Sequence, residues 1–184
     1  IKKVFYLGLP ASIEQSARAF GLIVMTFLIA SFGTLAVASY GVGSNILQLV
    51  IIPAMGLAMA ISTLVGQNIG AGNIQRASDI ARLGATVSFV GLTGIGIISF
   101  IFAPQFIAFF VPEDQAVIDA GAIFVRTISL TFGFLGVQMA FSAVFRASGN
   151  MVATMTLALV SQWVFQFPTA YILSKHTSLG VDGL

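Results

Sequence analysis

Five long apolar segments, which recur along the whole chain, constrain its fold more than any other feature. Each is long enough for the ~20 residues with which a helix crosses a hydrocarbon layer about 30 Å thick. The segments cover residues 4–32, 38–69, 80–102, 117–144 and 151–173. In hydrocarbon each backbone amide needs a partner within its own structure, and these runs lack the alternation of barrel strands. The sequence therefore predicts an all-α integral membrane protein, a bundle of five transmembrane helices.

Composition agrees with a lipid environment and narrows the possible partners. Of 184 residues, 58% are hydrophobic and 8% are charged, whereas roughly a quarter of a soluble domain is charged. The 8 basic and 6 acidic residues are scattered, so no nucleic-acid surface is expected. The chain has no cysteine, which excludes disulfides and thiolate metal sites. Because the first residue is Ile rather than Met and the tail shows no stop in the pattern, we expect the chain to be part of a longer protein.

Basic residues gather in alternate joints between the apolar segments. Five lie at the amino end and in the second and fourth joints, against one, Lys175, after the fifth segment. The five are Lys2, Lys3, Arg76, Arg82 and Arg146. Basic loops stay in the cytoplasm. We therefore expect a multi-pass protein of the plasma membrane, with the amino-terminal end of this chain cytoplasmic and its carboxyl end outside.

Three charged residues, Glu14, Arg18 and Arg126, lie well inside the apolar segments, away from their ends, where an ionised side chain costs at least ~2.5–3.5 kcal/mol. Glu14 and Arg18 are spaced i, i+4, so they lie on one helix face and can pair. Three roles stay open for them: a structural ion pair that fixes this helix to its neighbours, a glutamate that reaches the cytoplasmic interface, or cation binding in a cavity. Arg126 stands alone. Either it is a structural arginine, bound to backbone carbonyls or reaching the outer interface, or it lines a functional cavity.

Uncharged polar residues form stripes on the expected helices. The stripes are Thr127, Thr131, Gln138 and Ser142 in the fourth segment, Asn45 and Gln48 in the second, and Gln162 and Gln166 in the fifth. Such stripes either join helices by hydrogen bonds or line a polar passage. Pro53 removes a backbone donor and should kink the second segment, as a passive bend or as a mark of a transport site.

Enzyme chemistry has no visible basis in this sequence. No nucleophile stands beside a base, and the one histidine, His176, has no partner ligands around it. We therefore expect no catalytic residues, no metal site and no cofactor.

Several short motifs, in order along the chain, resemble landmarks of the multidrug and toxic compound extrusion (MATE) family. They are Gly8-Leu9-Pro10, Ala36 to Val42, Pro53-Ala54-Met55-Gly56, Gly66 to Asn73 followed by Arg76-Ala77, and Phe145 to Asn150. The resemblance covers the whole chain. It implies that residues 1–184 are a partial C-terminal lobe, resembling helices seven to eleven of a twelve-helix transporter.

The resemblance also implies a function. Members of the family export organic, mostly cationic drugs or metabolites in exchange for protons or sodium ions, by alternating access of two lobes. The partners implied are the bilayer and the missing N-terminal lobe of the same protein. Amide side chains suit loose recognition of varied solutes. We therefore expect the cavity to be lined by Gln15, Asn45, Gln48 and Gln138.

The chain departs from the NorM-like branch of the family, in which the seventh and tenth helices each carry a carboxylate. Arg18 stands near the first of those positions, and the fourth segment has no acid after Asp119. We therefore expect the acid that couples transport to the ion to lie in the missing lobe.

Two other functions stay open at this stage. A lipid-linked oligosaccharide flippase of the same superfamily should offer more basic residues to a pyrophosphate, for which only Arg18 and Arg126 could serve. A non-transporting membrane scaffold subunit would need no aqueous cavity.

Overall fold

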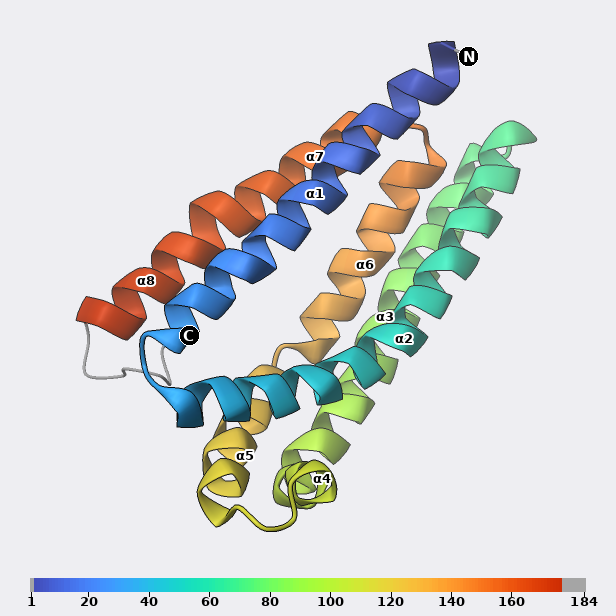
Figure 1. The fold of residues 1–184 in the computed structure, drawn as a ribbon. Coiled ribbons are helices and arrows are strands. Elements are labelled where there is room, and N and C mark those ends of the chain that lie inside the picture. Colours follow the sequence, from blue (N-terminus) through green and yellow to red (C-terminus); the bar gives the residue numbers. More distant parts are fainter. Residues whose placement is uncertain (1, 177–184) are drawn as a thin grey trace. The chain divides into compact units, whose positions relative to one another are not determined.

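The computed structural model describes residues 2–176, and in this range the chain is built from helices alone. The helices are α1 (Lys2–Ala30), α2 (Thr34–Gly70), α3 (Ile74–Ile101), α4 (Ala103–Phe110), α5 (Gln115–Ser129), α6 (Phe132–Ala147), α7 (Met151–Leu159), the π-helical η1 (Val160–Gln166) and α8 (Phe167–His176). Figure 1 shows their order along the chain. By length and composition, 3 of these helices could each cross a membrane, and the pair α5 and α6 makes a fourth span if counted as one. The predicted all-α membrane fold is confirmed.

The number of helices differs from the prediction of five continuous ones. The fourth segment, expected as one helix over residues 117–144, is two helices, α5 and α6, bent by 51°. Hydroxyl groups beside the break compete for helical carbonyls: Ser129 Oγ donates to the Arg126 carbonyl at 2.8 Å, and Thr131 Oγ1 donates to the Ile128 carbonyl at 2.7 Å. Such local bonds bend or end helices. In addition, the stretch between the third and fourth predicted segments contains a short helix, α4.

The fifth segment is helical but changes its winding. Between α7 and α8 it passes through η1, where the Phe167 N–H donates to the Gln162 carbonyl, one residue further back than in an α-helix. Pro168 follows at once and has no N–H to donate. The wider turn therefore lies where the regular hydrogen-bond ladder would be interrupted in any case.

The chain divides into two compact units, residues 1–38 with 149–184 and residues 39–148. In the first unit α1 lies beside α7 (Figure 1). Where η1 follows α7, a Cβ built at Gly21 of α1 would overlap the side-chain amide of Gln162, which would have to move aside. Met25 and Ile29 lie one and two turns further along and are buried. Gly21 thus lets the side chain of Gln162 lie directly against the α1 backbone.

In the second unit, α3 and α6 approach so closely that glycine on one faces backbone of the other. A Cβ built at Gly136 of α6 would lie 2.7 Å from the carbonyl oxygen of Ser88 on α3. At the end of α5, the carbonyl oxygen of Ser129 approaches α3 in the same way, 2.5 Å from a Cβ built at Gly96. Ala140 and Ala143 continue the α6 face as buried small residues. Lipid offers helices little hydrophobic drive to associate, so close van der Waals contact of this kind holds them together.

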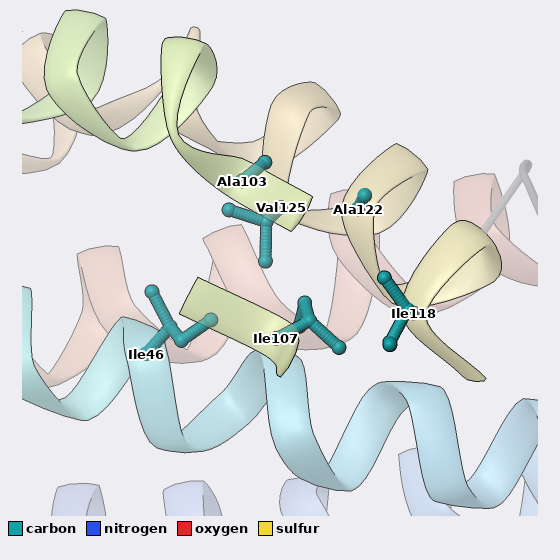
Figure 2. Close-up of a cluster of buried hydrophobic side chains, with 6 residues drawn as sticks. All are labelled: Ile46, Ala103, Ile107, Ile118, Ala122 and Val125. Carbon is teal, nitrogen blue, oxygen red and sulfur yellow. The ribbon is translucent and has the colours of Figure 1, made fainter. Parts of the chain in front are cut away.

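A cluster of buried apolar side chains joins α2, α4 and α5 at one end of the second unit. Its members are Ile46, Ala103, Ile107, Ile118, Ala122 and Val125. Figure 2 shows Ile107 of α4 between Ile46 of α2 and the α5 side chains. The short helix α4 is therefore part of the packed structure.

Three of the joints turn on a glycine with positive φ, which other residues adopt only with strain. These are Gly33 (φ 101°), Gly72 (φ 75°) and Gly149 (φ 78°). After the last of them, the side chain of Asn150 caps α7 by accepting the Ala153 N–H at 3.2 Å. Gly72, which lies in the motif from Gly66 to Asn73, therefore provides the tight exit from α2.

Candidate functional site

Glu14 and Arg18 form an ion pair on α1. Arg18 Nη2 lies 3.0 Å from Glu14 Oε1, the side chain of Glu14 is 2% exposed, and that of Arg18 is 46% exposed. The carboxylate is thus enclosed, while the guanidinium group extends to the surface of the described chain. Pairing reduces the cost of keeping either charge at membrane depth, because an isolated buried charge is far more costly than a paired one. The i, i+4 spacing brings the two groups within hydrogen-bond distance.

Arg126 makes a contact that depends on a proline. Its Nε donates to the carbonyl of Phe100 at 3.3 Å, and its guanidinium carbon lies 5.9 Å from the centre of the Phe100 ring. Residue 104, whose N–H would normally bond this carbonyl in a continuing helix, is proline and has none. Arg126 therefore supplies the donor that Pro104 lacks. A backbone carbonyl is one of the partners expected for Arg126, and in the structure it is that of Phe100. The proline four residues after Phe100 is the sequence signal that could have identified this partner.

The four amides predicted to line a cavity are exposed, and among the described residues none of them makes a side-chain hydrogen bond. Gln15 belongs to the first unit, and Asn45, Gln48 and Gln138 belong to the second. On α2, Asn45 and Gln48 point away from the side that buries Ile46. Gln138 lies on the side of α6 opposite Gly136 and Ala140. Their joint role in a cavity stays a prediction.

The predicted polar stripe of the fourth segment does not follow one helix, because the break at Leu130 and Thr131 separates its two halves. In the first half, the hydroxyls of Thr127 and Thr131 donate to the Ile123 and Ile128 carbonyls at 2.9 and 2.7 Å. In the second half, Gln138 is exposed and Ser142 partly buried. Of this stripe, we therefore retain Gln138 as the candidate contact for a solute.

Pro53 lies inside α2, which continues as one helix through it. The ribbon of α2 changes direction part of the way along (Figure 1). Pro53 leaves the carbonyl of Leu49 without its regular partner. A part for Pro53 in gating stays a prediction.

Comparison with known proteins identifies the family. The MatE family model matches residues 10–172. A probable multidrug resistance protein NorM from Thermotoga maritima is 29% identical over 182 residues, which are 99% of this chain and 39% of that protein. The chain thus spans about two-fifths of the length of this relative.

Solved structures share the fold. An inward-facing and an outward-facing structure of multidrug resistance MATE family transporters each match with a TM-score of 0.89 and 23% identity. Each match covers 98% of this chain, with 42% of the inward-facing and 40% of the outward-facing chain. The helices, their order and the family match agree along nearly the whole sequence. The chain is therefore part of a multi-pass membrane protein and belongs to the MatE family of multidrug and toxic compound extrusion transporters.

Proposed function

We propose that the protein containing this chain is a secondary active antiporter. It exports organic, mostly cationic drugs or metabolites in exchange for protons or sodium ions, by alternating access of two lobes. The observation that carries the proposal is the set of four exposed amides, Gln15, Asn45, Gln48 and Gln138, on the largely apolar membrane helices of a MatE chain. An amide both donates and accepts, so it can meet many solutes without a fixed partner. Family members of known structure occur in inward-facing and outward-facing forms, which supports the alternating-access part of the proposal.

Transport by the full-length protein tests this function. Purified protein in proteoliposomes should move a fluorescent organic cation when a proton or a sodium gradient is imposed, and should stop when that gradient is collapsed. Each gradient is imposed separately, so that the coupling ion is identified. Transport that continues without any gradient, or no transport in either case, would refute the proposal.

The amides are tested by Gln48→Leu and Gln138→Leu. Each removes hydrogen-bonding capacity from an exposed position, and since one such bond contributes about 0.5–1.5 kcal/mol, we expect dye binding to weaken about two- to tenfold. Gln75→Leu is the matched control, because Gln75 is an exposed glutamine at the start of α3, outside the proposed cavity. Unchanged affinity in folded Gln48→Leu and Gln138→Leu proteins would remove these residues from the binding site.

We place the acid that couples transport to the ion in the N-terminal lobe, and we assign Glu14 and Arg18 a structural role. The support is their mutual contact at 3.0 Å, in which the two charges compensate each other. A double variant, Glu14→Gln with Arg18→Gln, removes both charges of the ion pair together. It should still depend on the same ion. A folded double variant that transports without ion dependence would instead make Glu14 the coupling group.

We place the protein in the plasma membrane, with the amino-terminal end of this chain in the cytoplasm. The support is the position of the exposed Arg76 and Arg82 next to the joint between α2 and α3, and of the exposed acids Glu113 and Asp114 before α5. Single cysteines at positions 75 and 113 of a cysteine-free protein test this orientation. A membrane-impermeant maleimide should label Glu113→Cys on intact cells and Gln75→Cys only after permeabilisation. The reverse pattern would overturn the orientation.

A further inference from the structure

A notch in the second unit lies between α3 and the break that separates α5 from α6. It has a volume of about 250 Å³. Its lining includes Gly96, Ile97, Phe100, Ser129, Leu130 and Gly133. The notch lies beside the 51° bend between α5 and α6, where Gly96 and Gly133 contribute no side chain to its lining. Its rim is apolar and open, with Ile97 57% and Leu130 70% exposed.

Arg126 stands at the edge of this notch. It shares Phe100 with the lining, since its Nε donates to the Phe100 carbonyl and its guanidinium group lies over the Phe100 ring. The Ser129 hydroxyl, also in the lining, donates to the backbone carbonyl of Arg126. Among the described residues, Nη1 and Nη2 of Arg126 make no hydrogen bond or ion pair. The guanidinium group of Arg126 is therefore held through Nε, and Nη1 and Nη2 remain available to bind the two oxygens of an anion.

The depth of Arg126 matches a lipid headgroup. Helix α3 has 28 residues, about 42 Å at the standard rise, so it is longer than a hydrocarbon layer of about 30 Å and should project some 6 Å at each end. Phe100 is the last residue but one of α3. The guanidinium group beside it therefore lies near the headgroups, and the notch lies below it at the depth of the acyl chains.

The charges around Arg126 leave its positive charge available. Asp119 is seven residues earlier, about 10 Å along α5, and its carboxylate accepts a hydrogen bond from Gln115 at 2.9 Å. Asp114 caps the start of α5 by accepting the Ala116 N–H at 3.1 Å. Neither acid forms a salt bridge with Arg126 in the part of the chain that the structure describes.

We propose that Arg126 and this notch form a binding site for one anionic phospholipid. The fork of the guanidinium group binds the phosphate, a geometry that arginine favours. An acyl chain fills the apolar notch between α3 and the α5–α6 break. The positive charge selects anionic over zwitterionic lipid, and the open apolar rim requires a ligand with a chain. The site is independent of the proposed solute cavity.

Lipid binding to the purified full-length protein tests the proposal. Native mass spectrometry measures the dissociation constants for phosphatidylglycerol and for phosphatidylcholine with the same acyl chains. Wild-type protein should retain phosphatidylglycerol more tightly, and Arg126→Gln should weaken its binding about fivefold, the effect of one basic residue near a membrane surface. Equal affinity for the two lipids, or phosphatidylglycerol binding unchanged in Arg126→Gln, would overturn the proposal.

A second pair of variants tests the notch without altering the charge. Ile97→Phe adds volume to the lining and should weaken phosphatidylglycerol binding, whereas Ile98→Phe changes an exposed neighbour outside the lining and should leave it unchanged. These variants remain informative if Arg126→Gln does not fold. Equal effects of the two phenylalanines would overturn the acyl-chain contact. Glycerophosphoglycerol, the headgroup alone, should not compete at concentrations at which the lipid does, and full competition would show a plain anion site instead.

Discussion

Replacing Gly136 with alanine tests whether close backbone contact holds α3 and α6 together. The new Cβ would lie 2.7 Å from the carbonyl oxygen of Ser88 and 3.0 Å from its carbonyl carbon. Both atoms belong to the backbone, so no flexible side chain can move aside, and the helices themselves must shift. Overpacking of this kind costs about 1–3 kcal/mol. We therefore expect Gly136→Ala to lower the stability of the folded protein by that amount.

Gly94→Ala is the matched control, because it adds the same methyl group to α3 at a position where a Cβ meets nothing within 4 Å. Since alanine restricts the unfolded chain more than glycine does, this change should stabilise by about 0.4–1 kcal/mol. The two variants should thus differ by about 1.4–4 kcal/mol.

Thermal unfolding of the full-length protein in mild detergent measures this difference. A change of 1 kcal/mol shifts Tm by about 2–4 °C in chains of 150–250 residues, and by less in longer ones. Gly136→Ala should therefore melt several degrees below Gly94→Ala. Equal melting temperatures for the two variants would refute a backbone contact between α3 and α6.

Two further predictions concern the joints and use the same melting assay. Asn150→Ala removes the side-chain hydrogen bond to the start of α7 and should lower the free energy of unfolding by about 1 kcal/mol. Asn73→Ala should lower it less, because Asn73 makes no side-chain cap to α3. Equal losses of stability would contradict the capping role of Asn150. Gly149→Ala forces a side chain into positive φ and should cost about 1–2 kcal/mol. Gly70→Ala is the control and should be tolerated, because φ at Gly70 is not positive and no atom lies within 4 Å of the new Cβ. If Gly149→Ala were tolerated equally well, the backbone at Gly149 would not be strained by a side chain.

Apolar length and short-range spacing were the reliable guides to this fold. The segments predicted over residues 4–32, 38–69 and 80–102 correspond to α1, α2 and α3, because an apolar run that crosses lipid must satisfy its own backbone. Spacing also places Glu14 beside Arg18, since residues four apart are neighbours on any helix. Both inferences need only the local geometry of one helix.

The break between α5 and α6 escaped prediction because no proline marks it. Ser129 and Thr131 end α5 through hydrogen bonds to their own turn, and the same residue types continue helices elsewhere in this chain. The hydroxyl of Thr86 on α3, for example, donates to the Arg82 carbonyl at 3.0 Å without interrupting the helix. What differs at the break is the packing against α3, where Gly96 and Gly133 admit close contact. Contacts between segments are not visible in the composition of either one.

Many polar side chains on the described helices have a hydrogen-bond partner within the fold, whereas others have none there and are therefore candidates for function. Hydroxyls such as that of Thr63 donate to the carbonyl four residues back, Glu14 and Arg18 compensate each other, and Arg126 bonds a carbonyl that Pro104 leaves without a donor. Lipid penalises polar groups without partners, so such groups on a membrane helix need contact with protein, water or solute. The exposed amides, Gln15, Asn45, Gln48 and Gln138, are in that position. Their faces should therefore be turned from lipid in the full-length protein, which is what a solute cavity requires.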